Sequence, residues 1–293
     1  MLSKSLLTRL EDGRKAVALE TTLLCHGVPR ESALPLADEL DAIVRQAGSV
    51  PAIVGVLNGT ATVGITRDEL IMLLDAGPVA KVNTANIGLA LHRRLHAATT
   101  VSATMELAAA AGVRVFATGG IGGIHRGYSQ RFDVSSDLTA LTRFPVAVVC
   151  SGVKSLLDVV ATREALETLG IPVVGYQADR FPAFYVRDGG TGVDARFDDV
   201  NELAAFVRFE LERTQRGVLI ANPIPPDAQI ASLQWETWRA EAMARIGDVQ
   251  GRDVTPRVLS LLHELSGGRT LQANLALVRN NAALAAAIAA QGV

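Results

Sequence analysis

Residues Val115–Asp158 read VFATGGIGGIHRGYSQRFDVSSDLTALTRFPVAVVCSGVKSLLD, and this stretch decides the fold. It carries two apolar, β-rich runs, the first over 113–118 and the second over 146–150. The second run is continuous and β-branched, as in strands that are buried on both faces of a parallel sheet. Ligands in open α/β sheets bind beyond the carboxyl ends of the strands, so the polar residues after each run predict a functional site.

Lys154 follows the second run after the turn Ser151-Gly152. The sequence after that turn predicts a helix that begins near Val153, with Lys154 in its first turn. A positive helix N-terminus disfavours an ammonium group and so helps a lysine to act as an amine. We therefore expect Lys154 to be a reactive amine at the carboxyl edge of the sheet.

A glycine-rich run, GGIGG at 119–123, follows the first strand. It predicts a turn that needs missing Cβ atoms or positive φ angles, and such a turn can bring backbone N–H groups close to an anion. His125 and Arg126 come directly after it. The run is therefore a candidate anion-binding element.

An acidic loop, FDVSSD at 132–137, lies between the two strands. Two carboxylates, Asp133 and Asp137, with hydroxyls between them suit a hard divalent cation such as Mg²⁺ or Mn²⁺. Alternatively, Ser135 or Ser136 caps a short helix over 138–142, and Asp137 stabilises the N-terminus of that helix. The spacing leaves both interpretations open.

The rest of the chain alternates short apolar runs with amphipathic segments and contains no internal repeat or long polar linker. These patterns predict strands at 16–19, 52–57, 62–65, 172–176 and 217–221, and helices at 32–47, 66–75, 156–169, 201–214 and 270–290. Asn58-Gly59 predicts a hairpin and hence some antiparallel pairing. We expect an α/β fold: a single domain over residues 1–293 with a mixed, largely parallel sheet flanked by helices.

Two further candidates lie near strand ends. Glu20 ends the strand at 16–19 and is followed by Thr21-Thr22, so it is either a functional carboxylate or a solvated strand end. Lys81 follows the break at Gly77-Pro78 and has β-branched neighbours. It either points from a strand end toward the site or is a surface lysine.

Two asparagines share one face of the predicted last helix. Asn274 and Asn281 lie seven residues apart in a segment that is otherwise mostly alanine and leucine. A buried asparagine costs free energy unless its amide finds partners. Those partners are either other protein groups or a ligand.

Composition excludes several classes of protein. A net charge of −2 lacks the electrostatic footprint of a general nucleic-acid binder, and no apolar run is long enough for a membrane span. The charged N-terminus has no apolar signal core, so we expect a cytoplasmic protein. Cys25 and Cys150 lie in apolar sequence and predict buried thiols rather than a disulfide.

Several separate segments together resemble the pseudouridine-5′-phosphate glycosidase family, which is indigoidine synthase A-like, over nearly the whole chain. They occur in the family's order, at similar separations: VALETTLLCHG, TTVSATM, VFATGGIGGIHRG, FDVSSDL, PVAVVCSGVKSLLD, PVVGYQAD, FPAFYVR, ANPIP and LQANLALVRNNA. The resemblance implies reversible cleavage of the C–C glycosidic bond of pseudouridine 5′-phosphate to uracil and ribose 5-phosphate. It also implies one Mn²⁺ per subunit and a homotrimer.

The resemblance assigns roles residue by residue. It implies that Lys154 is the nucleophile, that Glu20 is the proton donor and that Asp133 binds the metal. The implied substrate contacts are Lys81, Val101, Ser135, Ser136, Asp137, His125 and Asn281.

One departure bears on the substrate. The family commonly reads K-V-S-R-R-D from the lysine at 81, whereas this chain reads KVNTAN over 81–86 and so lacks two arginines and an aspartate. Two alternatives follow: a C-glycosynthase that joins ribose 5-phosphate to another carbon acid, and a non-catalytic sugar-phosphate binding protein. Glu20, Asp133 and Lys154 together argue against the second alternative, because a binding protein needs no lysine nucleophile.

Overall fold

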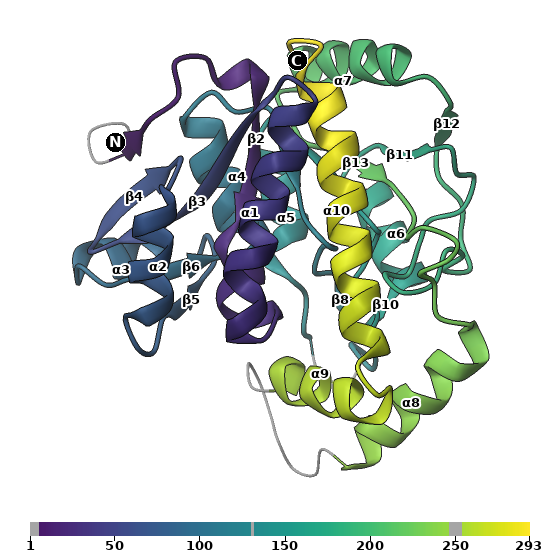
Figure 1. Ribbon diagram of the computed structural model, residues 1–293. Coiled ribbons are helices and arrows are strands. Elements are labelled where there is room, and N and C mark those ends of the chain that lie inside the picture. The colour runs from purple at the N-terminus through teal and green to yellow at the C-terminus, as the bar shows by residue number, and fades with distance from the viewer. Residues whose placement is uncertain (1–5, 130–131, 246–253) are drawn as a thin grey trace.

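A large mixed sheet carries the fold, and helices cover both of its faces (Figure 1). The computed structural model describes residues 6–129, 132–245 and 254–293. Within them the strand order is β1-β4-β3-β2-β7-β9-β13-β11-β12, with β6 and β5 branching from β3. The strands are β1 (Leu6–Thr8), β2 (Ala16–Glu20), β3 (Val50–Leu57), β4 (Thr60–Val63), β5 (Ala80–Val82), β6 (Ala97–Thr99), β7 (Val115–Ala117), β9 (Ala147–Cys150), β11 (Val173–Tyr176), β12 (Ala195–Phe197) and β13 (Val218–Ala221). The predicted fold class is confirmed.

The centre of the sheet is parallel, because β2, β7, β9, β13 and β11 pair in that order and in one direction. Every residue of β9 has 0% of its surface exposed, as its continuous apolar sequence predicts. Antiparallel pairing joins β3 to β4 through the predicted hairpin, in which Asn58 and Gly59 both have positive φ. The carboxyl ends of the central parallel strands therefore meet at one edge.

Helices form a layer on each face. The layer in front in Figure 1 holds α1 (Arg30–Gln46), α2 (Arg67–Asp75), α7 (Val200–Thr214) and α10 (Arg269–Ala289). The other layer holds α3 (Ile87–His92), α4 (Val101–Ala110), α5 (Ser136–Arg143) and α6 (Val159–Thr168). Two further helices, α8 (Ser232–Arg245) and α9 (Val254–Leu265), pack on each other near the beginning of α10.

Two predictions that rest on composition, the absence of a membrane span and the free cysteines, can be compared with the structure. None of them combines the length and the hydropathy that a membrane crossing requires. Cys150 is buried, Cys25 is half-buried, and both are free thiols. Burial raises the pKa of the Cys25 thiol to about 11 and that of the Cys150 thiol to about 12.

The prediction of a helix that begins near Val153 is wrong. Residues after Ser151 form a loop that reaches β10 (Leu157–Asp158), and α6 begins only at Val159, where the Asp158 side chain accepts the N–H of Ala161. Two backbone groups of the loop bond to the glycine run, Ser151 N–H to Gly119 O and Lys154 N–H to Ile121 O, while Leu157 N–H bonds within the loop to Lys154 O. Pairing with a distant turn has replaced the local helix.

The glycine run needs missing Cβ atoms rather than positive φ. None of its glycines has positive φ, but a Cβ at Gly122 would lie 2.3 Å from Ser135 Oγ. The loop that begins at Ser151 differs, because Gly152 has a φ of 75° and a Cβ there would meet the Pro182 carbonyl. Close packing of three loops at the sheet edge therefore explains these glycines.

Candidate active site

The candidate site lies at the carboxyl ends of the central strands. Glu20 is the last residue of β2, and its side chain is directed to the edge where β7 and β9 also end. Thr118 directly follows β7, and its hydroxyl donates to Glu20 Oε1 at 2.5 Å. The alternative of a solvated strand end is wrong, since only 6% of Glu20 is exposed.

Glu20 is a carboxyl group that is poised to hold a proton. Burial raises its pKa above the ordinary 4.5, although the positive charge of Lys154 and the Thr118 hydrogen bond oppose that shift. Oε2 is buried and has no hydrogen-bond partner within the described residues. A buried carboxyl oxygen without a partner suits proton transfer to a bound substrate.

Lys154 reaches the same place from the loop after β9. The loop is held at both sides of the lysine, because Lys154 N–H bonds to Ile121 O and Lys154 O accepts the N–H of Leu157. Its charge interacts with Glu20. Within the described ranges, its side chain has no hydrogen bond or ion pair, so the amine is available to a substrate.

Lys81 belongs to the same electrostatic environment. It lies in β5, is exposed, and lowers the pKa of both Glu20 and His26 through its positive charge. The pKa of His26 is lowered mainly by burial. The structure therefore brings Glu20, Lys154 and Lys81 together from three different parts of the chain.

Asp137 is committed to backbone groups. Its Oδ1 accepts the N–H of Ser102 at 3.0 Å, its Oδ2 accepts the N–H of Gly122 at 2.8 Å, and only 4% of the residue is exposed. Ser135 caps α5, as the alternative interpretation of this loop predicts, by accepting the N–H of Asp137. These contacts favour the capping interpretation of the loop, and the Gly122 N–H is used by the Asp137 carboxylate. Cation binding at this loop and anion binding by the glycine run stay predictions.

The other residues of this region form the joint between two helices. Ser136 Oγ lies 3.0 Å from Ser102 Oγ, and the side chain of Val101 is fully buried at the start of α4. Substrate contacts at Val101, Ser135, Ser136 and Asp137 stay predictions.

Asp133 lies in a different setting. Its side chain is 62% exposed, and its Oδ2 is 3.8 Å from His125 Nδ1. No group of three potential metal-ligating side chains occurs in the described part of the chain. One accessible carboxylate fits an ion such as Mn²⁺ or Mg²⁺ only if water supplies most of its ligands, which these ions accept.

Asn281 bonds to protein groups, and the substrate contact that the resemblance implies there stays a prediction. The residue is fully buried and its amide bonds only to protein groups, including Thr118 O and Asn222 Nδ2. Asn274, on the same face of α10, donates to Gly27 O at 3.4 Å, and its Oδ1 has no partner within the described residues.

The unusual segment at 82–86 forms a closed turn between β5 and α3. Asn86 Oδ1 accepts the N–H of Asn83, and Asn83 Oδ1 accepts the N–H of Ala85. Both asparagine oxygens are thus engaged in the turn itself.

Thr118 and Ser151 support the site but were not among the predicted site residues. Both are polar residues that directly follow an apolar strand run, and both are almost fully buried. That position after a buried strand was the available signal.

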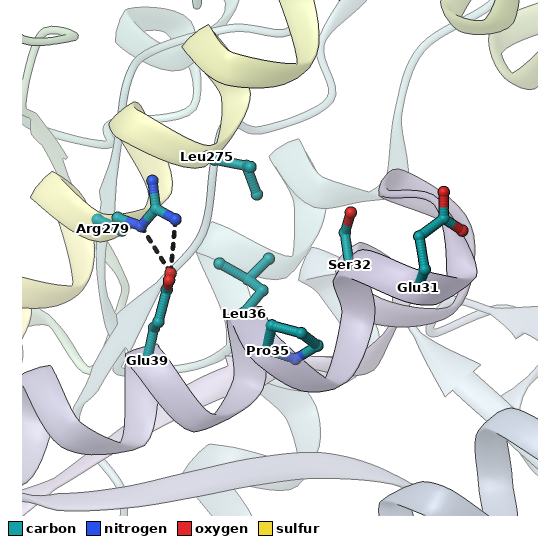
Figure 2. A pocket seen from close by; sticks show the side chains of 7 residues that line it. All are labelled: Glu31, Ser32, Pro35, Leu36, Glu39, Leu275 and Arg279. Atoms are coloured by element: carbon teal, nitrogen blue, oxygen red, sulfur yellow. Dashed lines mark hydrogen bonds and ion pairs between the residues drawn. The ribbon is translucent and has the colours of Figure 1, made fainter.

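A separate pocket lies between α1 and α10, away from these residues (Figure 2). Figure 2 shows Arg279 of α10 reaching Glu39 of α1, with Leu36 and Leu275 between the helices. The ion pair joins two exposed side chains, so it adds little stability. The pocket contains none of the predicted site residues.

Comparison with known proteins identifies relatives over nearly the full chain. A family model described as indigoidine synthase A like protein matches residues 6–291. The chain is 44% identical over 291 residues to a pseudouridine-5′-phosphate glycosidase of a Nocardioides species, covering 98% of this chain and 95% of the relative. It is 47% identical over 286 residues to one of Methylobacterium nodulans, covering 96% and 84%.

Two solved structures share the fold. An indigoidine synthase A-like protein of Thermotoga maritima superposes with a TM-score of 0.89 at 38% identity, over 97% of this chain and 95% of the other. The prealnumycin C-glycosynthase AlnA, in complex with ribulose 5-phosphate, superposes with a TM-score of 0.88 at 32% identity, over 97% and 96%.

Proposed function

The chain belongs to the indigoidine synthase A-like family, and we propose that it reversibly cleaves pseudouridine 5′-phosphate to uracil and ribose 5-phosphate. The observation that carries this proposal is the meeting of Glu20 and Lys154 at the sheet edge. The names of the relatives agree with it.

The reaction explains the need for a lysine. The bond to be broken joins C1′ of the ribose to a carbon of uracil, so no leaving-group oxygen can be protonated as in ordinary glycosidases. Addition of the Lys154 amine to C1′ opens the ribose ring, and Glu20 gives its proton to the ring oxygen. The C–N bond forms as the C–O bond breaks, and Glu20 takes back a proton from the nitrogen.

Cleavage then follows from the adduct. The C–C bond breaks, its electron pair goes to the uracil carbon, and that carbon receives the proton from Glu20. The C1′–nitrogen bond becomes an imine, which one water molecule hydrolyses to ribose 5-phosphate and free Lys154. The net reaction consumes one water, and both residues return to their starting protonation states.

A metal ion is part of the proposal. Asp133 would hold Mn²⁺ with water completing its shell, and the ion would supply positive charge to orient the substrate. Its exposed carboxylate supports this assignment. We also propose that Lys81 contacts the phosphorylated substrate together with His125. The positive charge of Lys81 acts on Glu20, whose pKa it lowers.

The resemblance further supports a homotrimer in the cytoplasm. Multi-angle light scattering tests the first point, because a trimer has three times the mass of the chain. Immunolocalisation or cell fractionation tests the second.

A C-glycosynthase is the second candidate function. The structural likeness to AlnA favours it, as does the closed asparagine turn at 82–86, which differs from the pattern common in the family. Its relative is 32% identical, whereas the glycosidases are 44% and 47% identical. The sequence similarity therefore favours the glycosidase.

One assay separates the candidates. The purified protein is incubated with pseudouridine 5′-phosphate, with and without Mn²⁺, and uracil is measured; ribose 5-phosphate is then offered with uracil or with other carbon acids. We expect uracil release and resynthesis from uracil. Absence of uracil release, with synthesis from another carbon acid, would establish the second candidate instead.

A further inference from the structure

One asparagine joins the ends of three neighbouring strands. The strands β7, β9 and β13 are adjacent and parallel, and the first residues after them are Thr118, Ser151 and Asn222. Asn281 reaches all three from α10, which crosses this face of the sheet in Figure 1. The three residues meet at one amide although they are far apart in the chain.

The hydrogen bonds at this point use the whole amide. Asn281 Nδ2 donates to Thr118 O at 2.8 Å and to Ser151 Oγ at 3.2 Å, while Oδ1 accepts from Asn222 Nδ2 at 3.0 Å. The Ser151 hydroxyl donates in turn to Asn222 O at 2.9 Å. Each proton of Asn281 has an acceptor inside the protein, so its burial is compensated.

Two of the hydrogen bonds of Asn281, those to Thr118 and to Ser151, lead to a residue of the proposed chemistry. Thr118, whose carbonyl accepts from Asn281, donates its own hydroxyl to Glu20. Ser151 begins the loop that carries Lys154 three residues later, and its carbonyl accepts the N–H of Phe184. Asn281 itself touches neither Glu20 nor Lys154 by a hydrogen bond within the described residues.

We infer that Asn281 is a positioning residue that sets the distance between Glu20 and Lys154 by tying together the strand ends that bear their supports. Glu20 and Lys154 belong to different segments, and the proposed mechanism needs both at one carbon atom. Packing alone leaves adjacent loops free to shift, whereas directional hydrogen bonds from one rigid helix hold both in register. The assignment to catalysis rests on the proposed function; the structural tie does not.

The test compares Asn281→Leu with a control on the same helix. Leucine keeps the branched shape of the side chain, is somewhat larger, and removes every hydrogen bond. Ser49→Ala is the control, because the buried Ser49 hydroxyl donates to Ala286 O of α10 at 2.8 Å, away from the strand ends. It removes a buried hydrogen bond to the same helix without touching the tie.

Activity is the first readout. A displacement of about 1 Å at reacting groups can cost roughly a hundredfold in rate, so we expect kcat of Asn281→Leu to fall by about that factor with little change in KM. Ser49→Ala should keep both constants within about twofold. A rise in KM with unchanged kcat would show that Asn281 contacts substrate and would overturn the inference, as would wild-type kinetics in Asn281→Leu.

The pH dependence of kcat/KM is the second readout. The Thr118 hydroxyl lowers the pKa of Glu20, as do the charges of Lys154 and Lys81, whereas Asp137 raises it. If Thr118 is displaced, the part of the pH profile that reports the titration of Glu20 should therefore move to higher pH. An unmoved pH profile together with a lower kcat would contradict a route through Thr118.

Amide hydrogen exchange is the readout that does not depend on substrate. Peptides that cover 116–124 and 150–157 should exchange faster in Asn281→Leu and not in Ser49→Ala, because both tied segments lose an anchor. Faster exchange in Asn281→Leu, combined with a wild-type protein that releases no uracil, would refute the proposed function but keep the tie. Unchanged exchange would refute the tie.

A second variant keeps the test decisive if Asn281→Leu does not fold. Ser151→Ala removes the hydrogen bond between Asn281 and Ser151 and leaves Asn281 bonded to Thr118 and Asn222. We expect a smaller fall in kcat and faster exchange of 150–157 alone. Wild-type exchange and kinetics in Ser151→Ala would overturn the inference.

Discussion

The site at the strand ends, which holds Glu20, Thr118 and Lys154, and the loop that carries Asp133 differ in their exposure to water. Glu20 is 6% exposed and its supporting hydroxyl is buried, whereas the Asp133 side chain is 62% exposed. Burial raises the pKa of Glu20 and would shield the proposed proton transfer and imine from bulk water. An exposed carboxylate instead suits a hydrated divalent ion, which brings its own water ligands.

The supports differ as well. The strand-end site rests on four parallel strands and on side chains that span the whole chain from β2 to α10. Asp133 is held through its backbone: its carbonyl accepts the N–H of His125, and Val134 bridges to Ile124. Substitutions should therefore be felt most at the strand ends and least at the loop.

The largest effect is expected for Lys154→Arg. The guanidinium keeps the charge but stays protonated and cannot add to C1′, so turnover should fall by at least about a thousandfold. Circular dichroism should show a folded protein. Reduction with borohydride during incubation with ribose 5-phosphate should add a pentose-phosphate mass to the peptide that contains Lys154. That mass on another lysine would contradict the assignment.

The second largest effect is expected for Glu20→Gln. An amide cannot transfer the proton, and loss of general acid–base catalysis costs about a hundredfold to ten-thousandfold in kcat. Single-turnover measurements with pseudouridine 5′-phosphate check this. A loss below about tenfold would transfer the proton role to another group.

The same variant should change how stability depends on pH. The folded pKa of Glu20 lies above its ordinary 4.5, so its contribution is fully present below pH 4.5 and is lost as pH rises toward the folded value. Relative to Glu20→Gln, the wild type should therefore lose stability as pH rises from 4.5. Urea unfolding of both proteins between pH 4 and pH 8 measures the difference, and parallel curves would refute a raised pKa.

Asp133→Ala should have a smaller effect of a different kind. Metal-dependent activity should fall by roughly tenfold to a hundredfold, while the free energy of unfolding changes by less than about 0.5 kcal/mol because the side chain is exposed. Titration of activity with Mn²⁺ after treatment with a chelator checks the first point. Wild-type activity of the variant in metal-free buffer would remove the metal role.

The smallest effect is expected for Lys81→Ala. Lys81 is exposed, and an ion pair of an exposed side chain contributes about 0.2–1 kcal/mol, so KM for pseudouridine 5′-phosphate should rise by roughly twofold to fivefold. KM for unphosphorylated pseudouridine should change less. Equal changes for the two substrates would remove the phosphate assignment.

Local patterns predicted much of the architecture. The helix predicted at 66–75 is confirmed as α2, and it begins with a capping box: Thr66 Oγ1 accepts the N–H of Glu69, and the Glu69 carboxylate accepts the N–H of Thr66. The helix α8 was missed, since only Trp235 and Ala242 of its residues are buried and its amphipathic signal is weak. The candidate residues Glu20 and Lys154 were found because each lies at the end of an apolar strand run.

The sequence by itself determined the strands and helices with a clear apolar period, the hairpin at Asn58-Gly59 and the chemical identity of the carboxyl, amine and metal-binding candidates, since these depend on neighbours within a few residues. Only the tertiary structure decided that Lys154 lies in a loop, that Asp137 serves backbone amides and that Asn281 bonds inside the protein. Those outcomes depend on partners 35 residues away for Asp137 and 163 residues away for Asn281. A hydrogen bond over such a separation is fixed by the packed sheet, which no local pattern contains.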